Sequence, residues 1–336
     1  MKKTLIITLE FPPQIGGIAT YVHDFAKQLD PKQVIVLAPT EKAAAAWDAE
    51  QPYKIIRKKL LFPKIFWPRW LKLFFIAQKL CKQEGIELVL IHHALPVGYV
   101  GILLKKIKKI PFAVFFHGTD VLLGTKTRWK NHLTRQVCST AERLIFNSQS
   151  LKNRLTQVIP EVEAKSVVLY PGPDSDLFIP PPEVELTNLR RTYALEGKQV
   201  LLTVSRFAEG KGFPHLIRVV SEVVKVNPNI VWLIIGSGQK EKELLLEIQK
   251  SNLQNIARFV GSVPHEKIKP FYYLADLFIL LTHPDEYTDE GCGVVFLEAA
   301  AAGLPVIAGR SGGVEEVVLH TQTGLVFDVY QQFPAI

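Results

Sequence analysis

Short apolar runs rich in β-branched residues alternate along the chain with stretches of helical periodicity. The runs predict buried strands at Thr4–Leu9, Gln33–Ala38, Leu88–His92, Phe112–Phe116 and Arg143–Asn147. The same rhythm restarts later, at Gln199–Ser205, Ile230–Gly236, Ala257–Gly261, Leu277–Leu281 and Pro305–Ala308. Strands separated by helices need crossover connections, which favour parallel sheets. The pattern therefore predicts an α/β protein with two Rossmann-like domains.

The segment Tyr170–Glu183 separates these two series, and its five prolines and one glycine exclude a regular element. A chain of 336 residues also exceeds what one hydrophobic core usually organises. We expect an N-terminal domain over residues 1–170, a linker over 171–183 and a C-terminal domain over 184–336. Open parallel sheets bind ligands at the carboxyl ends of their strands, so we expect the domains to face each other across a crevice.

Composition narrows the class of protein. The chain is 48% hydrophobic and 21% charged, which excludes a disordered protein. The most apolar region, Leu60–Leu80, contains four lysine and arginine residues and so predicts no spanning helix. The apolar run near the amino terminus stops at Glu10 and fits a first strand better than a signal peptide. Three scattered cysteines argue against disulfides and zinc, so we expect a cytoplasmic protein.

A net charge of +8 admits anionic partners, and the segment Lys54–Lys82 concentrates that charge. It carries nine basic residues and no acidic one, and six phenylalanines and tryptophans are interleaved with them. One interpretation is a surface that lies on anionic lipid at the inner face of a membrane, extended by Lys105–Lys109. The other is an amphipathic element packed on the first sheet with a solvated basic face. Nucleic acid is not favoured, because no binding motif accompanies the charge.

The stretch from Glu290 to Glu298 carries the strongest signal for chemistry. Gly291, Cys292 and Gly293 form a short loop before a predicted helix, so the amides of Val294 and Val295 are expected to face an anion. Glu290 is expected beside the ligand, and Glu298 is placed to accept hydrogen bonds from a ribose diol. Two glutamates at this spacing also fit an ordinary solvated loop and helix.

Three further candidate sites follow predicted strands, where a crevice would bind ligands. Arg206 and Lys211, with glycines between and beside them, suit a diphosphate that gains charge as its bond breaks, although a solvated basic loop has the same composition. Gly16 and Gly17 precede a predicted helix at Ile18–Leu29 and suit close approach of a phosphate or a plain turn. His117 ends a strand, where it is either structural or a partner for a sugar hydroxyl.

Taken together, these motifs resemble the family 4 retaining glycosyltransferases, which have the GT-B architecture of two Rossmann-like domains. The resemblance spans nearly the whole chain, in order, and its motifs are FPPQIGGIATYV, HGTD, LYPGPDSDLF, SRFAEGKGF, FVGSVPHEKIKPFYYLADLFIL and EGCGVVFLEAAAAGLPVIAGRSGGVEEVV. It implies transfer of a hexose from a nucleoside-diphosphate sugar to a glycan, lipid-linked or other acceptor. It also implies retention of configuration without a metal or another cofactor.

The resemblance assigns roles to the candidate residues. Arg206 and Lys211 would hold the donor diphosphate, and Glu298 would hold the ribose. Glu290 and the loop amides from Gly291 to Val295, with Cys292 and Gly293 between, would hold the sugar, and Gly16 and Gly17 would lie beside the phosphates. His117 would contact the sugar near the anomeric carbon. No residue stands out as a covalent nucleophile, so we expect same-face attack with stabilisation of the leaving group.

One departure from the family is expected at the carboxyl end, where related chains continue beyond the GLVF motif through further elements. We expect the C-terminal domain to be truncated, which keeps open a non-catalytic membrane-surface protein of the same fold. A sugar-nucleotide epimerase or hydrolase of the same fold is the other alternative.

Overall fold

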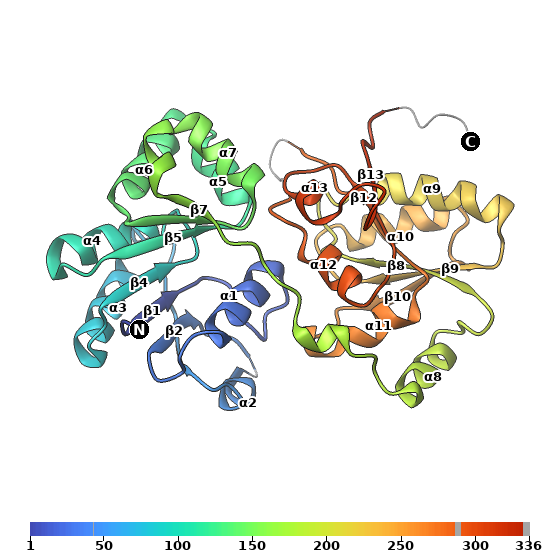
Figure 1. Ribbon diagram of the computed structural model, residues 1–336, viewed down its shortest axis with the longest axis horizontal. Coiled ribbons are helices and arrows are strands. Elements are labelled where there is room, and N and C mark those ends of the chain that lie inside the picture. Colours follow the sequence, from blue (N-terminus) through green and yellow to red (C-terminus); the bar gives the residue numbers. More distant parts are fainter. Residues whose placement is uncertain (43, 286–289, 332–336) are drawn as a thin grey trace. The chain divides into compact units, whose positions relative to one another are not determined.

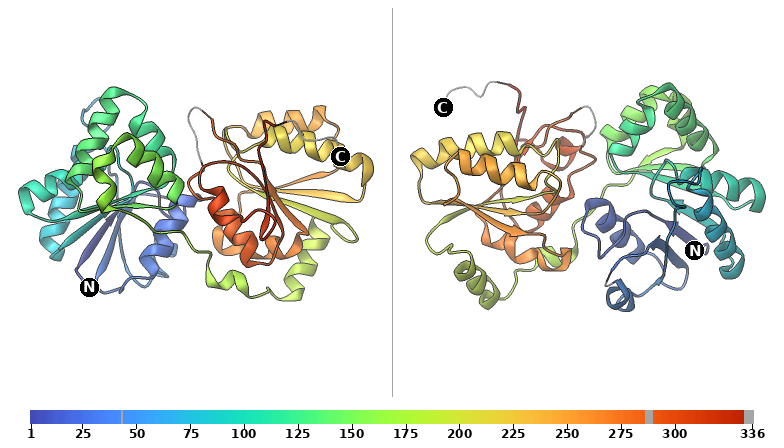
Figure 2. Two further views of the ribbon diagram at one scale, coloured as in Figure 1. Left: turned by 45° about the horizontal axis from the view of Figure 1, so that its top comes forward. Right: turned by 180° about the vertical axis from the view of Figure 1, so that it is seen from behind.

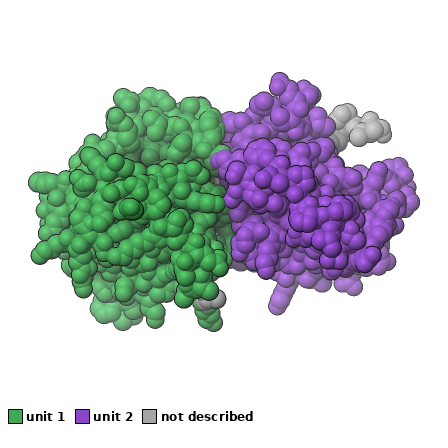
Figure 3. All heavy atoms as spheres, turned by 60° about the horizontal axis from the view of Figure 1, so that its bottom comes forward, with its two compact units in different colours: residues 1–171 green, residues 172–336 purple. Residues whose placement is uncertain are grey.

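The computed structural model describes residues 1–42, 44–285 and 290–331, and the chain forms two compact units, 1–171 and 172–336 (Figure 3). Three clusters of buried apolar residues form the cores. Two of them draw only on unit 1 and the third only on unit 2. Each unit is therefore organised around its own hydrophobic core.

Unit 1 is built on a seven-stranded sheet with the order β3-β2-β1-β4-β5-β6-β7 (Figure 1). All pairings between its described strands are parallel. The strands are β1 (Thr4–Ile7), β2 (Val34–Pro39), β3 (Lys54–Lys58), β4 (Leu88–Ile91), β5 (Phe112–Phe116), β6 (Arg143–Phe146) and β7 (Ser166–Val168).

Helices cover both faces of this sheet, because successive strand residues point to opposite sides (Figure 2). Ile6 of β1 belongs to the same buried cluster as Tyr21 and Val22, whereas Leu5 and Ile7 belong to the cluster on the opposite face. The helices are α1 (Gly17–Lys27), α2 (Ala44–Ala49), α3 (Leu71–Glu84), α4 (Gly98–Lys108), α5 (Thr119–Thr125), α6 (Arg128–Thr140) and α7 (Gln149–Val158). Helix α1 covers one face, and α3, α4, α6 and α7 cover the other.

Unit 2 repeats this plan with a six-stranded parallel sheet in the order β10-β9-β8-β11-β12-β13. Its strands are β8 (Gln199–Val204), β9 (Ile230–Ile235), β10 (Ala257–Gly261), β11 (Leu277–Leu280), β12 (Val306–Gly309) and β13 (Gly324–Phe327). Its helices are α8 (Glu183–Thr192), α9 (Phe213–Val226), α10 (Glu241–Lys250), α11 (Lys269–Leu274), α12 (Val294–Ala301) and α13 (Val314–Val317). Short 3-10 turns lie at Pro160–Lys165 in unit 1 and at Ser175–Phe178 and His265–Lys267 in unit 2.

The predicted α/β class and all ten predicted strands are confirmed, within one or two residues at each end. Three strands were not predicted, namely β3, β7 and β13, and each lies at the edge of its sheet. Edge strands are buried on fewer sides, so β3 (KIIRK) lacks the uniform apolar run that marks a central strand. The basic segment Lys54–Lys82 accordingly divides into edge strand β3, an exposed loop and helix α3.

Candidate functional site

The loop between β8 and α9 holds Arg206 and Lys211 at the carboxyl end of the central strand of unit 2. Gly212 caps α9 with a φ of 71°, and a Cβ there would lie 1.8 Å from the carbonyl oxygen of Leu281. Only glycine fits this close approach, which fixes the loop against the end of β11. The sequence therefore folds so that both cations emerge from a rigid turn.

Lys211 and Glu290 form an ion pair, with 2.6 Å between Nζ and Oε2. Their side chains are 20% and 17% exposed, so solvent screens this pair less than a surface pair. Arg206 is exposed, and within the described residues its guanidinium has no hydrogen-bond or ionic partner. The structure thus leaves Arg206 as a cation available to an anionic ligand, while Lys211 and Glu290 hold each other in place.

The glycine loop Gly291–Gly293 leads directly into the first turn of α12. Gly293 has a φ of 77°, and a Cβ there would lie 2.5 Å from the ring of Phe296, so a side chain is excluded. The helix begins at Val294, and the Phe296 amide donates to the Gly293 carbonyl at 3.0 Å, whereas no acceptor for the amides of Val294 and Val295 is found among the described residues. Burial raises the pKa of the neighbouring Cys292 thiol to about 12, so this cysteine packs as a neutral side chain.

Glu298 is 4% exposed and is held inside unit 2 through both carboxylate oxygens. The hydroxyl of Tyr272 donates to Oε2 at 2.5 Å, and His265 Nε2 lies 3.0 Å from Oε1. Burial, and then the negative charge of Glu298, raise the pKa of Tyr272 well above its ordinary value, so the phenol remains a donor. A ribose diol would have to share these oxygens with Tyr272 and His265, two residues that the sequence analysis did not single out.

In unit 1, Gly16 and Gly17 form the turn into α1. No atom lies within 4 Å of a Cβ built on Gly17, so the space beside this residue is open. The segment that precedes this turn is tethered by Arg57 of β3, whose guanidinium donates to the carbonyl of Pro12 and forms an ion pair with Asp48 at 2.6 Å. The sequence analysis counted Arg57 only as part of a basic run, because its partners are distant in the sequence.

His117 follows β5 and is fixed through its backbone and its ring. Its amide donates to Asp120 Oδ1 at 3.1 Å, and its carbonyl accepts from Asn147 Nδ2 at 3.2 Å. Its Nε2 lies 3.2 Å from Nδ1 of His92, which follows β4. Burial, with a smaller effect of His93, lowers the pKa of His117 to about 3, so the imidazole is neutral at physiological pH.

Burial raises the pKa of Asp120 to about 6, although the amides of Gly118, His117 and Val121 act in the opposite direction. At neutral pH the carboxylate is therefore ionised and caps the turn after β5.

The predicted site residues lie in two groups, one in each unit. Arg206, Lys211 and Glu290 follow strands β8 and β11 of unit 2, and Gly17 and His117 follow β1 and β5 of unit 1.

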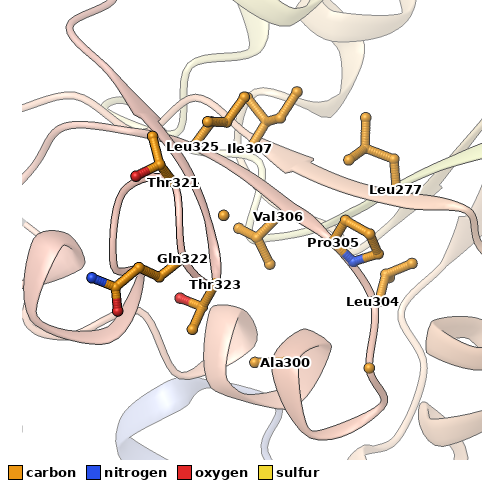
Figure 4. A pocket seen from close by; sticks show the side chains of 12 residues that line it. Leu277, Ala300, Leu304, Pro305, Val306, Ile307, Thr321, Gln322, Thr323 and Leu325 are labelled. Atoms are coloured by element: carbon orange, nitrogen blue, oxygen red, sulfur yellow. The ribbon is translucent and has the colours of Figure 1, made fainter.

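A separate apolar hollow of about 570 Å³ lies in unit 2 (Figure 4). Its lining includes Leu277, Val306 and Gly324, which are the first residues of β11, β12 and β13. The hollow therefore lies at the amino ends of these strands, at the opposite edge of the sheet from the candidate donor residues.

A metal-binding cluster and a membrane-spanning helix are both lacking in the described part of the chain. In residues 1–42, 44–285 and 290–331, no three or more histidine, cysteine, aspartate or glutamate side chains form a group that could hold a metal ion. No helix in the described part of the chain is long and apolar enough to cross a membrane.

Comparison with known families gives matches to both halves of the chain. The model described as Glycosyltransferase Family 4 matches residues 15–177, and the model described as Glycosyl transferases group 1 matches residues 187–333. The GDP-mannose-dependent alpha-(1-6)-phosphatidylinositol monomannoside mannosyltransferase of Mycolicibacterium smegmatis is 29% identical, over 96% of this chain and 85% of the relative. The D-inositol 3-phosphate glycosyltransferase of Corynebacterium jeikeium is 27% identical, over 93% of this chain and 80% of the relative.

Solved structures share the fold. Anabaena HepE in complex with UDP-glucose superposes with a TM-score of 0.82 and 21% identity, over 98% of this chain and 86% of that chain. WaaG, a glycosyltransferase involved in lipopolysaccharide biosynthesis, superposes with a TM-score of 0.70 and 16% identity, over 97% and 86% of the two chains. The two parallel Rossmann-like sheets are therefore those of the GT-B fold.

Proposed function

Because the chain belongs to the group 1, family 4 glycosyltransferases, we propose that it transfers a hexose from a nucleoside-diphosphate sugar with retention of anomeric configuration. As a member of this family it is a glycosyltransferase that uses a nucleotide sugar. The observation that carries the proposal is the group formed by the exposed Arg206, the Lys211–Glu290 pair and the first amides of α12. Fixed cations and helix amides stabilise the charge that a departing diphosphate acquires.

The roles within this proposal follow the chemistry of each side chain. Arg206 and Lys211 bind the diphosphate, and Glu290 with the amides from Gly291 to Val295 binds the transferred sugar. Glu298 binds the ribose, held in orientation by Tyr272. In unit 1, Gly16 and Gly17 lie beside the phosphates and His117 contacts the sugar.

Calorimetry with UDP, GDP, ADP and their hexose conjugates tests the donor site directly. GDP-mannose heads the panel, because the mannosyltransferase relatives named after that donor are 28–29% identical to this chain. Arg206→Ala is expected to weaken binding at least tenfold, since it removes a charged hydrogen-bond donor. Arg191→Ala, which removes an exposed arginine from the end of α8, is the matched control and should leave binding unchanged.

Equal binding by wild type and Arg206→Ala would refute the assignment of the donor site. Chromatography that resolves sugar epimers, coupled to mass spectrometry, then separates transfer from the alternative chemistry in a reaction without acceptor. Intact donor supports a transferase, whereas an epimerised or hydrolysed donor supports an epimerase or hydrolase.

We further propose that the acceptor is lipid-linked and that unit 1 meets it at an anionic membrane surface on the cytoplasmic side. The loop after β3 supports this proposal, because Ile65 and Trp67 are 86% and 83% exposed and Lys64 and Arg69 are exposed beside them. Exposed aromatic and basic side chains suit the headgroup region of a bilayer. Two relatives are also named for phosphatidylinositol mannoside acceptors.

Co-sedimentation with vesicles of phosphatidylglycerol and phosphatidylcholine tests the surface. Binding should fall as salt rises and should drop in a Trp67→Ser variant, while Trp129→Ser, which changes another exposed tryptophan, serves as the control. Equal sedimentation with purely zwitterionic vesicles at every salt concentration contradicts the proposal.

A further inference from the structure

We propose that His92 is a positioning residue that holds His117 as an imidazole with its proton on Nδ1, so that His117 acts as a hydrogen-bond donor to the ligand. The inference deepens the proposed function, because it assigns the form in which His117 meets an oxygen of the sugar or phosphate. It arises from the geometry of the two rings at the carboxyl ends of β4 and β5.

His92 is fully buried and is held among aromatic rings. Its ring stacks on Phe115 with 4.2 Å between centroids, and Tyr21 and Phe25 pack against it at 6.2 and 6.0 Å. Its Nδ1 lies 3.2 Å from Nε2 of His117, and the two rings are nearly parallel, at 16°. Its other nitrogen, Nε2, is buried and has no hydrogen-bond partner among the described residues.

Two arrangements of protons fit one hydrogen bond between two neutral imidazoles. In the first, His92 carries its proton on Nδ1 and donates to His117, which leaves the unpaired Nε2 of His92 as a bare acceptor. In the second, His117 donates from Nε2, and His92 must then carry its proton on Nε2, where nothing accepts it. Unpaired N–H groups are rarer in protein interiors than unpaired acceptors, so the first arrangement is favoured.

Neither ring carries a second proton at neutral pH. Burial lowers the pKa of His92 well below its ordinary value, and the pKa of His117 is lowered to about 3. The pair therefore shares one hydrogen bond in the direction from His92 to His117.

The consequence for His117 is a fixed proton on Nδ1. The side chain is partly exposed, and across the described ranges Nδ1 accepts or donates no hydrogen bond within the protein. The bonds from its amide to Asp120 and from Asn147 to its carbonyl hold the backbone while His92 holds the ring. Since its Nε2 lone pair is already engaged, His117 is a donor to a hydroxyl or phosphate oxygen and is unsuited to act as a general base.

Nitrogen-15 NMR on histidine-labelled protein tests this directly, because protonated and bare imidazole nitrogens have distinct chemical shifts. The spectrum contains nine histidines, and His117 is assigned by its loss in His117→Gln. We expect His117 to be protonated on Nδ1 in wild type. In His92→Phe, which keeps a ring against Phe115 but removes the donor, we expect the proton to move to Nε2. In His92→Asn, the side-chain amide keeps a donor near the position that Nδ1 of His92 occupies in wild type. We therefore expect His117 in this variant to stay protonated on its own Nδ1.

Titration with GDP-mannose supplies a second measurement. His92→Phe should weaken binding roughly tenfold or more, as when a residue that orients a ligand-binding group is removed, and His92→Asn should lie closer to wild type. A wild-type His117 protonated on Nε2, or one that His92→Phe leaves unchanged, overturns the proposal. The NMR result needs no ligand, so it stands apart from the Arg206→Ala experiment, whose failure would count against the donor site alone.

Discussion

The histidines at the ends of β4 and β5 should make unit 1 sensitive to acid. Burial lowers the pKa of His93 to about 4 and that of His117 to about 3, against about 6.5 in an unfolded chain. Because the folded pKa values are lowered, the unfolded state takes up protons first as the pH falls. These groups therefore cost little stability above pH 6.5, and as the pH falls further the cost grows down to about pH 4 for His93 and about pH 3 for His117.

The size of this acid destabilisation follows from the difference in proton binding between the folded and unfolded states. Between pH 8 and pH 5, each of these two histidines lowers the free energy of unfolding by about 2 kcal/mol. Both side chains are partly exposed, so the combined effect lies between about 2 and 4 kcal/mol once solvent screening is allowed for. His92 acts in the same direction. Asp120 opposes them by about 1 kcal/mol, because its raised pKa of about 6 lets the folded state bind a proton at pH 5.

The assay must isolate unit 1, since a protein with two cores need not unfold in one step. Pulsed hydrogen exchange over a urea series, read by mass spectrometry on peptides from β4 and β5, gives the free energy of unfolding of this unit. Between pH 8 and pH 5, we expect the free energy of unfolding of unit 1 to fall by about 1 to 2 kcal/mol less in His93→Gln than in wild type. His132→Gln, which removes an exposed histidine from α6, should lose as much as wild type. Equal losses in His93→Gln and wild type would refute the reasoning.

Three other substitutions have expected outcomes that urea unfolding and GDP-mannose titration can check. Gly17→Ala should raise the free energy of unfolding by about 0.5 to 1 kcal/mol, because Gly17 starts α1 and the added Cβ meets no atom within 4 Å. The same substitution should weaken donor binding. Unchanged binding would show that Gly17 does not belong to the donor site. Gly212→Ala should destabilise unit 2 by more than about 2 kcal/mol, because its Cβ would meet the Leu281 carbonyl in a left-handed conformation; wild-type stability would contradict this geometry. Tyr272→Phe should destabilise unit 2 by about 1 to 3 kcal/mol and weaken donor binding, because Glu298 loses a buried donor; loss of stability with unchanged binding would leave Tyr272 a purely structural role.

The central strands were predictable because they are buried on both faces and therefore read as uninterrupted apolar runs. Strand β3 was not, since its alternation of lysine, isoleucine and arginine is also typical of a basic surface segment. The glycine positions were predictable from the sequence for a similar reason. Gly212 and Gly293 both adopt left-handed conformations that other residues avoid, so their place before a helix carries information.

Side chains that support the site through distant partners were beyond prediction. Tyr272 reaches Glu298 across 26 positions, and Arg57 reaches Pro12 across 45. Such pairings depend on the order of strands in the sheet, which no local pattern specifies. For His92 a signal existed, because two adjacent histidines follow a strand beside the strand of His117, but the direction of the hydrogen bond needs the coordinates.

The separate cores of the two units have a consequence for how such chains diversify. Among the described residues each buried cluster draws on one unit alone, so an exchange of halves at the boundary between Pro171 and Gly172 keeps every cluster within one parent chain. A hybrid of this kind would take the turn with Arg206 and Lys211 and the loop Gly291–Gly293 from one parent. It would take the exposed loop after β3, with Trp67, from the other. If the donor binds unit 2 as proposed, recombination or deliberate shuffling at that boundary is expected to change the acceptor while the proposed donor residues stay together.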